Sequence, residues 1–129
     1  MRAGHPLARG ELTPARFATE PDHVIVSRRG RTQDPTDELL AAMNLERKVA
    51  MTAPTAATAL LFVRDSDLVA TVPEPVARTA ADHGLVVLPL PFATPPIPLY
   101  LSWHQRHDND RAHAWLRNKA QRALQRISS

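Results

Sequence analysis

The sequence predicts an α/β fold with a mostly parallel β-sheet sandwiched by helices, because short β-prone runs alternate with helical stretches through the first 92 residues. The clearest unit lies within residues 47–73. Residues 49–52 and 68–72 are β-prone, and the apolar block between them does not alternate as a strand does. Two strands joined by a helix require a parallel pair and a right-handed crossover.

Two helix starts and one further strand come before that unit. Thr13 and Asp34 are capping residues, and each is followed by a proline (Pro14, Pro35) at the first helical position, so each predicts a helix. Between them, residues 23–27 read His-Val-Ile-Val-Ser, which is typical of a strand buried on both faces.

After residue 73 the sequence predicts one more helix and strand, then a proline-rich stretch and a long final helix. Residues 75–83 are expected to form a helix that stops at Gly84, and residues 85–90 a strand. A proline-rich stretch then leads to an expected strand at residues 99–104 and to a long amphipathic helix. The apolar side of that helix consists of Ala112, Trp115, Leu116, Ala120, Ala123, Leu124 and Ile127.

Composition narrows the possible functions. The net charge is +3, and the excess lies in residues 98–129, with six Lys/Arg against two Asp/Glu, which argues against a free-standing nucleic-acid binder. There is no cysteine for a disulfide, a thiolate nucleophile or a Cys-based zinc site. No apolar run is long enough for a membrane span or a signal peptide, so we expect a soluble, cytoplasmic protein.

Several short segments, in a definite order and spacing, carry a family resemblance. They are Gly4-His5-Pro6-Leu7-Ala8, Leu12-Thr13, Phe17-Ala18, His23-Val24-Ile25-Val26-Ser27 with Gly30, Val49-Ala50-Met51-Thr52-Ala53-Pro54, Asp67-Leu68-Val69-Ala70-Thr71-Val72-Pro73, Leu88-Pro89-Leu90-Pro91-Phe92, and Trp103-His104 with Asp108, His113, Trp115, Leu116 and Arg117. Together they resemble the effector-binding region of a LysR-type transcriptional regulator. The likeness spans nearly the whole chain and is greatest to the branch that often responds to aromatic or phenolic molecules.

The resemblance implies a particular domain arrangement. A full subunit of that family has an amino-terminal helix-turn-helix, a linker helix and two α/β lobes like those of a type 2 periplasmic binding protein, with the effector between them. Residues 1–92 correspond to the second lobe, and residues 93–129 to a crossing, strand and helix that return to the first lobe. The resemblance therefore implies no sequence-specific DNA binding by this chain and weak effector binding, since one wall of the pocket is absent.

Thr55 is the foremost candidate for a ligand contact. It follows a strand and precedes a helix, where free N–H groups and the helix dipole favour anions. The resemblance implies that Thr55 forms a turn with Thr52, Pro54 and Ala56. It also implies that this turn faces the cleft and holds a carboxylate or hydroxyl of the effector. The alternative is a helix cap that contributes about 1 kcal/mol and binds nothing.

Two further residues are weaker candidates. The resemblance puts His23 at a cleft-facing position, where it could meet a phenolate or carboxylate, whereas a surface pair with Asp22 is the alternative. Thr71 ends another strand near a helix start, so the argument for Thr55 extends to it.

Metal and catalytic chemistry find little support in the sequence. The cluster of His104, His107 and His113 with Asp108 and Asp110 lacks the spacing of a metal site, and we expect these residues to cap and solvate a turn. Phosphate-binding loops and nucleophile elbows are missing from the sequence, which therefore predicts no enzyme, no metal and no cofactor.

Two functions remain. The first is the small-molecule sensing part of a LysR-type regulator without its DNA-binding domain, which takes an aromatic or carboxylate effector. The second is a truncated paralogue that acts as a protein-interaction or dimerisation module, because an exposed apolar side of the final helix favours association with a partner. That partner is a second copy or an intact regulator subunit.

Overall fold

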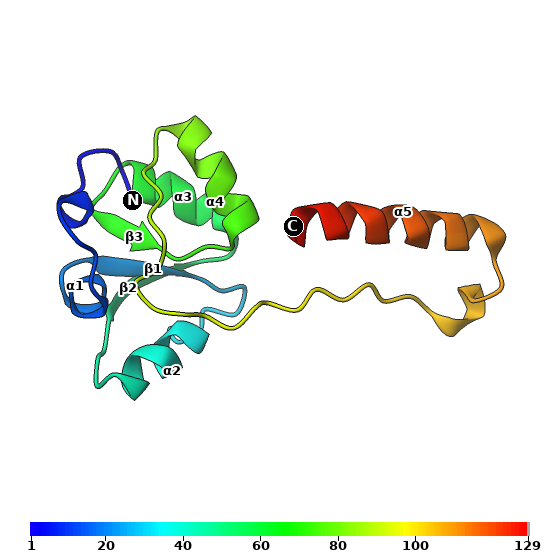
Figure 1. Cartoon of the computed structure of the whole chain (residues 1–129), viewed down its shortest axis with the longest axis horizontal. Helices are drawn as coiled ribbons and strands as arrows, with labels where there is room; N and C mark the ends of the chain where they lie inside the picture. Colours follow the sequence, from blue (N-terminus) through cyan, green and yellow to red (C-terminus); the bar gives the residue numbers. More distant parts are fainter. Residues whose placement is uncertain (129) are drawn as a thin grey trace. The chain divides into compact units, whose positions relative to one another are not determined.

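Three parallel strands in the order β2-β1-β3 form the sheet in the computed structural model of the chain, which describes residues 1–128 (Figure 1). The strands are β1 (Asp22–Val26), β2 (Lys48–Ala53) and β3 (Leu68–Ala70). Because β1 pairs with both neighbours, β2 and β3 are the two edges of the sheet. The predicted α/β fold with a parallel sheet is confirmed.

Helices connect and cover these strands. The α-helices are α1 (Pro14–Thr19), α2 (Pro35–Ala42), α3 (Ala56–Arg64), α4 (Glu74–Ala80) and α5 (Arg111–Ser128). Three short 3-10 turns add to them: η1 (Pro6–Ala8), η2 (Ala81–His83) and η3 (Gln105–His107). The helix starts predicted at Thr13 and Asp34 are confirmed, since both side chains accept hydrogen bonds from the first turn. Gly84 ends the α4–η2 segment in the left-handed conformation that glycine favours.

The central strand–helix–strand unit differs from the prediction in one respect. β2 and β3 are parallel, but β1 lies between them, so α3 carries the chain across β1. Residues 23–27 provide the reason, because their apolar side chains need cover on both faces and their backbone needs a partner on both sides.

Side chains pack in two clusters, one on each face of the sheet. Val24 and Ala53 share one face, where they meet Ala59 and Val63 of α3. His23 belongs to the other face, on which Phe17 of α1 lies, and Phe17 packs with Leu40 of α2 in the second cluster. The sheet is therefore the middle layer between α3 and α4 on one side and α1 and α2 on the other.

Two predicted strands do not form, and both failures have a physical reason. Residues 85–90 make a single bridge, between Arg2 and Leu85, because Pro89 removes a donor from the run. Residues 99–104 carry no regular structure, because no described segment pairs with them and an extended backbone needs such a partner to become a strand.

The chain divides into two units, Met1–Thr94 and Pro95–Ser129. The first unit holds the whole sheet and both apolar clusters. In the second unit, Trp103 donates to Asp108 (2.8 Å between Nε1 and Oδ1), and the Arg117 guanidinium lies 4.6 Å from the centre of the Trp103 ring. These contacts fix the turn that precedes α5.

Arg47 links α2 to the start of β2. Its side chain is only 1% exposed, and it makes two hydrogen bonds of 2.9 Å to the Asp37 carboxylate and an ion pair of 2.8 Å with Asp34. Asp34 and Asp37 also form the capping box of α2, so one cation and two acids connect the helix start to the strand. Burial acts to raise the pKa of Asp37, but its hydrogen bonds, first those from Arg47, leave that pKa below its ordinary value.

His23 is buried at the centre of the fold. Its ring is 0% exposed, its Nε2 donates to the Phe17 carbonyl at 2.9 Å, and the two rings meet edge to face at 4.9 Å. Because Nε2 carries the proton, Nδ1 is a bare acceptor, and it has no hydrogen-bond partner. Burial lowers the pKa of His23 from 6.5 to about 4, against the opposing effect of the Phe17 carbonyl.

Replacing Arg47 tests the link between α2 and β2. Arg47→Met leaves two acids facing each other without their cation, so we expect the free energy of unfolding to fall by about 3 kcal/mol in urea titrations followed by circular dichroism. Arg64→Met is the matched control, because the Arg64–Asp65 pair is more than half exposed on both sides and is worth less than about 1 kcal/mol. Equal losses of unfolding free energy in the two variants would contradict the conclusion that Arg47 links α2 to β2.

Acidification tests the burial of His23. Because the histidine binds its proton less readily in the folded state, the unfolded chain takes up more protons between pH 6.5 and 4, and stability falls as the pH falls. The expected loss from His23 between pH 7 and 5 is about 2 kcal/mol. Urea titrations of His23→Gln should lack this loss, whereas His83→Gln, which changes an exposed histidine, should retain it. The same pH dependence of stability in His23→Gln as in the unmodified chain would refute the conclusion that the burial of His23 causes this loss.

Candidate functional site

The turn between β2 and α3 is the first candidate site. β2 pairs with β1 up to Ala53 opposite Val26, and the ladder continues with a 2.8 Å bond from the Ser27 N–H to the Ala53 carbonyl. Pro54 cannot donate and ends the strand, and Thr55 then takes an extended conformation as the N-cap of α3. The parallel sheet thus brings this helix start to the edge where the strands end.

Thr55 is occupied by its own helix but leaves binding groups beside it. Its Oγ1 accepts the Thr58 N–H at 3.1 Å and lies 2.9 Å from the Thr58 hydroxyl, which confirms the predicted cap. The N–H groups of Ala56 and Ala57 lie in the first turn, where the helix offers them no acceptor, and the helix dipole is positive there. The turn can therefore hold an anionic or hydroxyl group of a ligand.

The predicted residues of this turn are accessible to different degrees. Pro54 and Thr55 are exposed, while Thr52 and Ala56 are half-buried. Because these four residues are consecutive or nearly so, they lie together in the turn between β2 and α3. No lining side chain of this turn is charged, so the backbone and the Thr55 hydroxyl provide its polarity.

His23 does not lie with them. It sits at the amino-terminal end of β1, in register with Val49 and Val69, whereas Thr55 follows the carboxyl-terminal end of β2. With no exposed atom, His23 offers a ligand no surface, and its polar contact is with the Phe17 carbonyl. The alternative surface pair with Asp22 is also absent, since Asp22 pairs with Lys48 at 3.0 Å.

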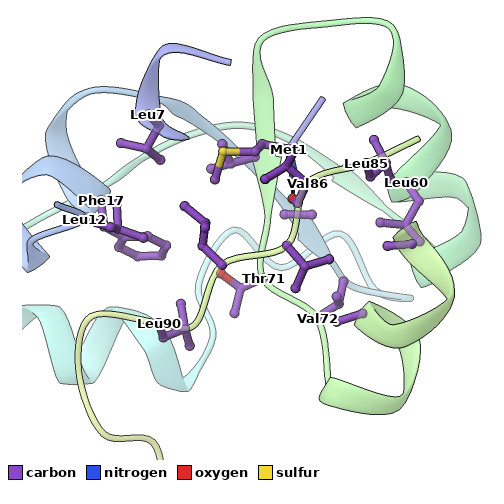
Figure 2. A pocket seen from close by; sticks show the side chains of 16 residues that line it. Met1, Leu7, Leu12, Phe17, Leu60, Thr71, Val72, Leu85, Val86 and Leu90 are labelled. Atoms are coloured by element: carbon purple, nitrogen blue, oxygen red, sulfur yellow. Dashed lines mark hydrogen bonds between the residues drawn. The ribbon is translucent and has the colours of Figure 1, made fainter. Parts of the chain in front are cut away.

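Thr71 follows β3 and is separated from the Thr55 turn by β1. Two strand spacings make that separation roughly 10 Å. Instead of facing the turn, Thr71 lines a cavity of about 90 Å³, and Figure 2 shows its hydroxyl among apolar side chains. The Thr71 Oγ1 is buried and has no hydrogen-bond partner in the described chain.

The histidines around the start of α5 act as caps and stacking partners. The His104 ring accepts the Arg106 N–H, and the Asp110 carboxylate accepts the His113 N–H at the start of α5. The rings of His107 and His113 stack with centres 4.6 Å apart. Within residues 1–128, no three His, Asp or Glu side chains are grouped so that they could hold a metal ion.

Sequence reasoning missed two features of the first unit. The Arg47 link was not predicted, although Asp34 and Asp37 three residues apart signal a capping box that a cation can join. The cavity was not predicted either, because its walls come from segments as distant as Leu7 and Leu90. No local pattern identifies such walls.

Comparisons with known proteins identify relatives along almost the whole chain. The family model described as the LysR substrate binding domain matches residues 1–125. The chain is 32% identical over 117 residues to the HTH-type transcriptional activator NahR of Pseudomonas putida and 30% identical over 118 residues to NagR, an activator of the same type from a Ralstonia species. These alignments cover 90% and 91% of the chain but only 39% of each relative.

A solved structure shares the fold as well as the sequence pattern. The regulatory domain of MexT, a transcriptional activator in Pseudomonas aeruginosa, superimposes with a TM-score of 0.75 and 32% sequence identity, over 88% of this chain and 56% of that one. The helices described here include none that is both long and apolar enough to cross a membrane. By the extent of the family match and the agreement in fold, the chain belongs to the LysR substrate-binding domain family.

Proposed function

We propose that the chain is the small-molecule sensing part of a LysR-type transcriptional regulator and binds an aromatic or carboxylate effector at the β2–α3 turn. The observation that carries the proposal is the start of α3 at the carboxyl end of β2, with an exposed Thr55 and unpaired N–H groups behind it. Family membership supports the same conclusion. The chain spans about two fifths of the curated relatives that it matches, so the role of a whole regulator is part of the proposal.

The proposed contacts are few. The effector's carboxylate or hydroxyl accepts from the N–H groups of Ala56 and Ala57 and meets the Thr55 hydroxyl, while Thr52 and Pro54 form the adjoining surface. His23 takes no part in these contacts, because it is fully buried and lies at the other end of β1. Residues 1–92 act as one effector-binding lobe, and residues 93–129 belong with another lobe, so this chain alone binds the effector weakly.

The remaining expectations follow from this role. As part of a transcriptional regulator the chain works in the cytoplasm, and its contribution is effector binding and association rather than recognition of a DNA sequence. Neither catalysis nor a cofactor enters the proposal.

A second candidate function is a protein-interaction or dimerisation module, and one observation favours it. The second unit exposes large apolar side chains along its extended stretch and along α5. They are Ile97, Leu99, Tyr100, Leu101, Trp103, Trp115, Leu116 and Ile127. Such a concentration of exposed apolar groups favours association, with a second copy or with an intact regulator subunit. The two functions are compatible within one chain.

Calorimetric titration with aromatic acids and phenols tests effector binding. We expect weak saturable binding that falls by about tenfold in Thr55→Val, because a hydrogen bond to a charged group is lost. Thr55→Ser keeps the hydroxyl and should keep the affinity. The matched control is Thr13→Val, which removes the equivalent N-cap from α1 and should leave binding unchanged. Absence of saturable heat with every compound, or equal affinity in all variants, would exclude the β2–α3 turn as the effector site.

Sedimentation equilibrium tests the second function. We expect concentration-dependent association of the full chain that weakens by at least about tenfold in Leu116→Glu, because a charge replaces an exposed apolar side chain of α5. Gln121→Glu adds the same charge at another exposed position of α5 and should associate like the unmodified chain. A monomer at every concentration would rule out self-association through this helix.

A further inference from the structure

The cavity of about 90 Å³ lies along the free edge of β3 and not at the Thr55 turn. One wall consists of residues 69–72, from β3 and its continuation, and the other includes Leu88 and Leu90, from the segment that runs past this edge. β3 forms its ladder only with β1 in the described chain, so no backbone pairing closes the gap to that segment. Figure 2 shows Leu12 and Phe17 on one side of Thr71, and Leu60 and Leu85 on the other.

The walls determine which molecules the cavity accepts. Every lining side chain except Thr71 is apolar, and the charged group beside them is the Met1 ammonium, which donates to the Val86 carbonyl at 3.1 Å. Burial lowers the pKa of this ammonium, so its charged form is disfavoured. A carboxylate would find no other cation among the lining residues and would lose its hydration, so a neutral and mostly apolar occupant is preferred. This chemistry differs from that of the β2–α3 turn, where N–H groups favour an anion.

Thr71 provides one polar point of recognition. Its Oγ1 is buried among these side chains and has no hydrogen-bond partner. Buried hydroxyls normally have a partner, because leaving one unpaired is unfavourable. A molecule with a single hydroxyl placed against Thr71 would satisfy this atom while its apolar part covers the surrounding leucine, valine and phenylalanine side chains.

The size of the cavity limits the occupant to a compact molecule. One ordered water needs roughly 10–15 Å³ by the same kind of measure and two or more polar partners, so the cavity has room for several waters, but Thr71 is the one lining side chain that can anchor a water. Apolar cavities of this kind favour small organic molecules over water. Phe17 adds the edge or face of an aromatic ring to the lining.

We propose that the cavity at the free edge of β3 is a second small-molecule site, which binds a neutral single-ring compound of the phenol type through apolar contacts and one hydrogen bond to the Thr71 hydroxyl. This site is independent of the effector site proposed at Thr55. Its occupant packs against residues 85–90, the segment that leads out of the β-sheet unit towards Thr94.

Methyl-detected NMR titration of the full chain with phenol, benzene and benzoate tests this proposal. Phenol should shift the methyl signals of Leu60, Leu88 and Leu90 saturably, benzene should bind more weakly, and benzoate should leave these signals unchanged. Thr71→Val replaces the hydroxyl with a methyl of the same shape and should remove the advantage of phenol over benzene, roughly two- to tenfold for one hydrogen bond.

Two further variants test whether the compounds bind in the cavity or at another site, and whether a loss of binding is caused by unfolding. Ala77→Met fills the cavity from α4 and should abolish binding of both phenol and benzene. Ala41→Met makes the same change at an exposed position of α2 outside both the cavity and the β2–α3 turn and should bind both compounds normally. Thr55→Val should retain phenol binding at the leucine methyl groups, so failure of the effector site and failure of this site give different results.

Several results would overturn the proposal. The first is an unchanged spectrum of Leu60, Leu88 and Leu90 at saturating phenol. The second is an equal preference for phenol over benzene in the unmodified chain and in Thr71→Val. The third is magnetisation transfer between long-lived water and Thr71 that phenol does not diminish, because the cavity would then be a hydrated void. Binding of benzoate with the same methyl shifts would refute the requirement for a neutral ligand.

Discussion

The burial of β1 on both faces and both edges is the constraint on which the rest of this structure depends. His23, Val24 and Ile25 are at most 2% exposed, and the backbone of the strand pairs with β2 on one side and β3 on the other. Parallel pairing in both directions forces the three strands to end at one edge of the sheet. That edge receives the start of α3, so the position of Thr55 follows from the burial of a strand 30 residues earlier in the chain.

Local sequence signals predicted most of the first unit. Thr13, Asp34 and Thr55 were identified as caps because the information lies within three residues of each. The strands expected at residues 85–90 and 99–104 failed for the opposite reason. A strand exists through its partner, and neither run finds a full partner in the described chain, although its composition is β-prone.

The candidate site was predictable only in part. The β2–α3 turn could be found because a proline after a strand and a threonine before an apolar block mark it directly. The ligand-facing position of His23 came from the resemblance, whereas the run of residues 23–27 predicted a strand buried on both faces. The structure agrees with the run, because Phe17, six residues earlier in α1, covers the His23 ring. The β3 cavity depends on residues from both ends of the unit, so its existence is a tertiary property.

The position of β2 at the outside of the sheet has a consequence for behaviour at high concentration. Its six residues present a row of backbone groups that another extended chain could pair with, which is the usual beginning of fibril growth. Lys48 at its first residue has a side chain that is 75% exposed, and Pro54 follows its last. A charge at one end and an imino acid at the other restrict such pairing along β2 to a few residues, which disfavours aggregation through this edge of the sheet.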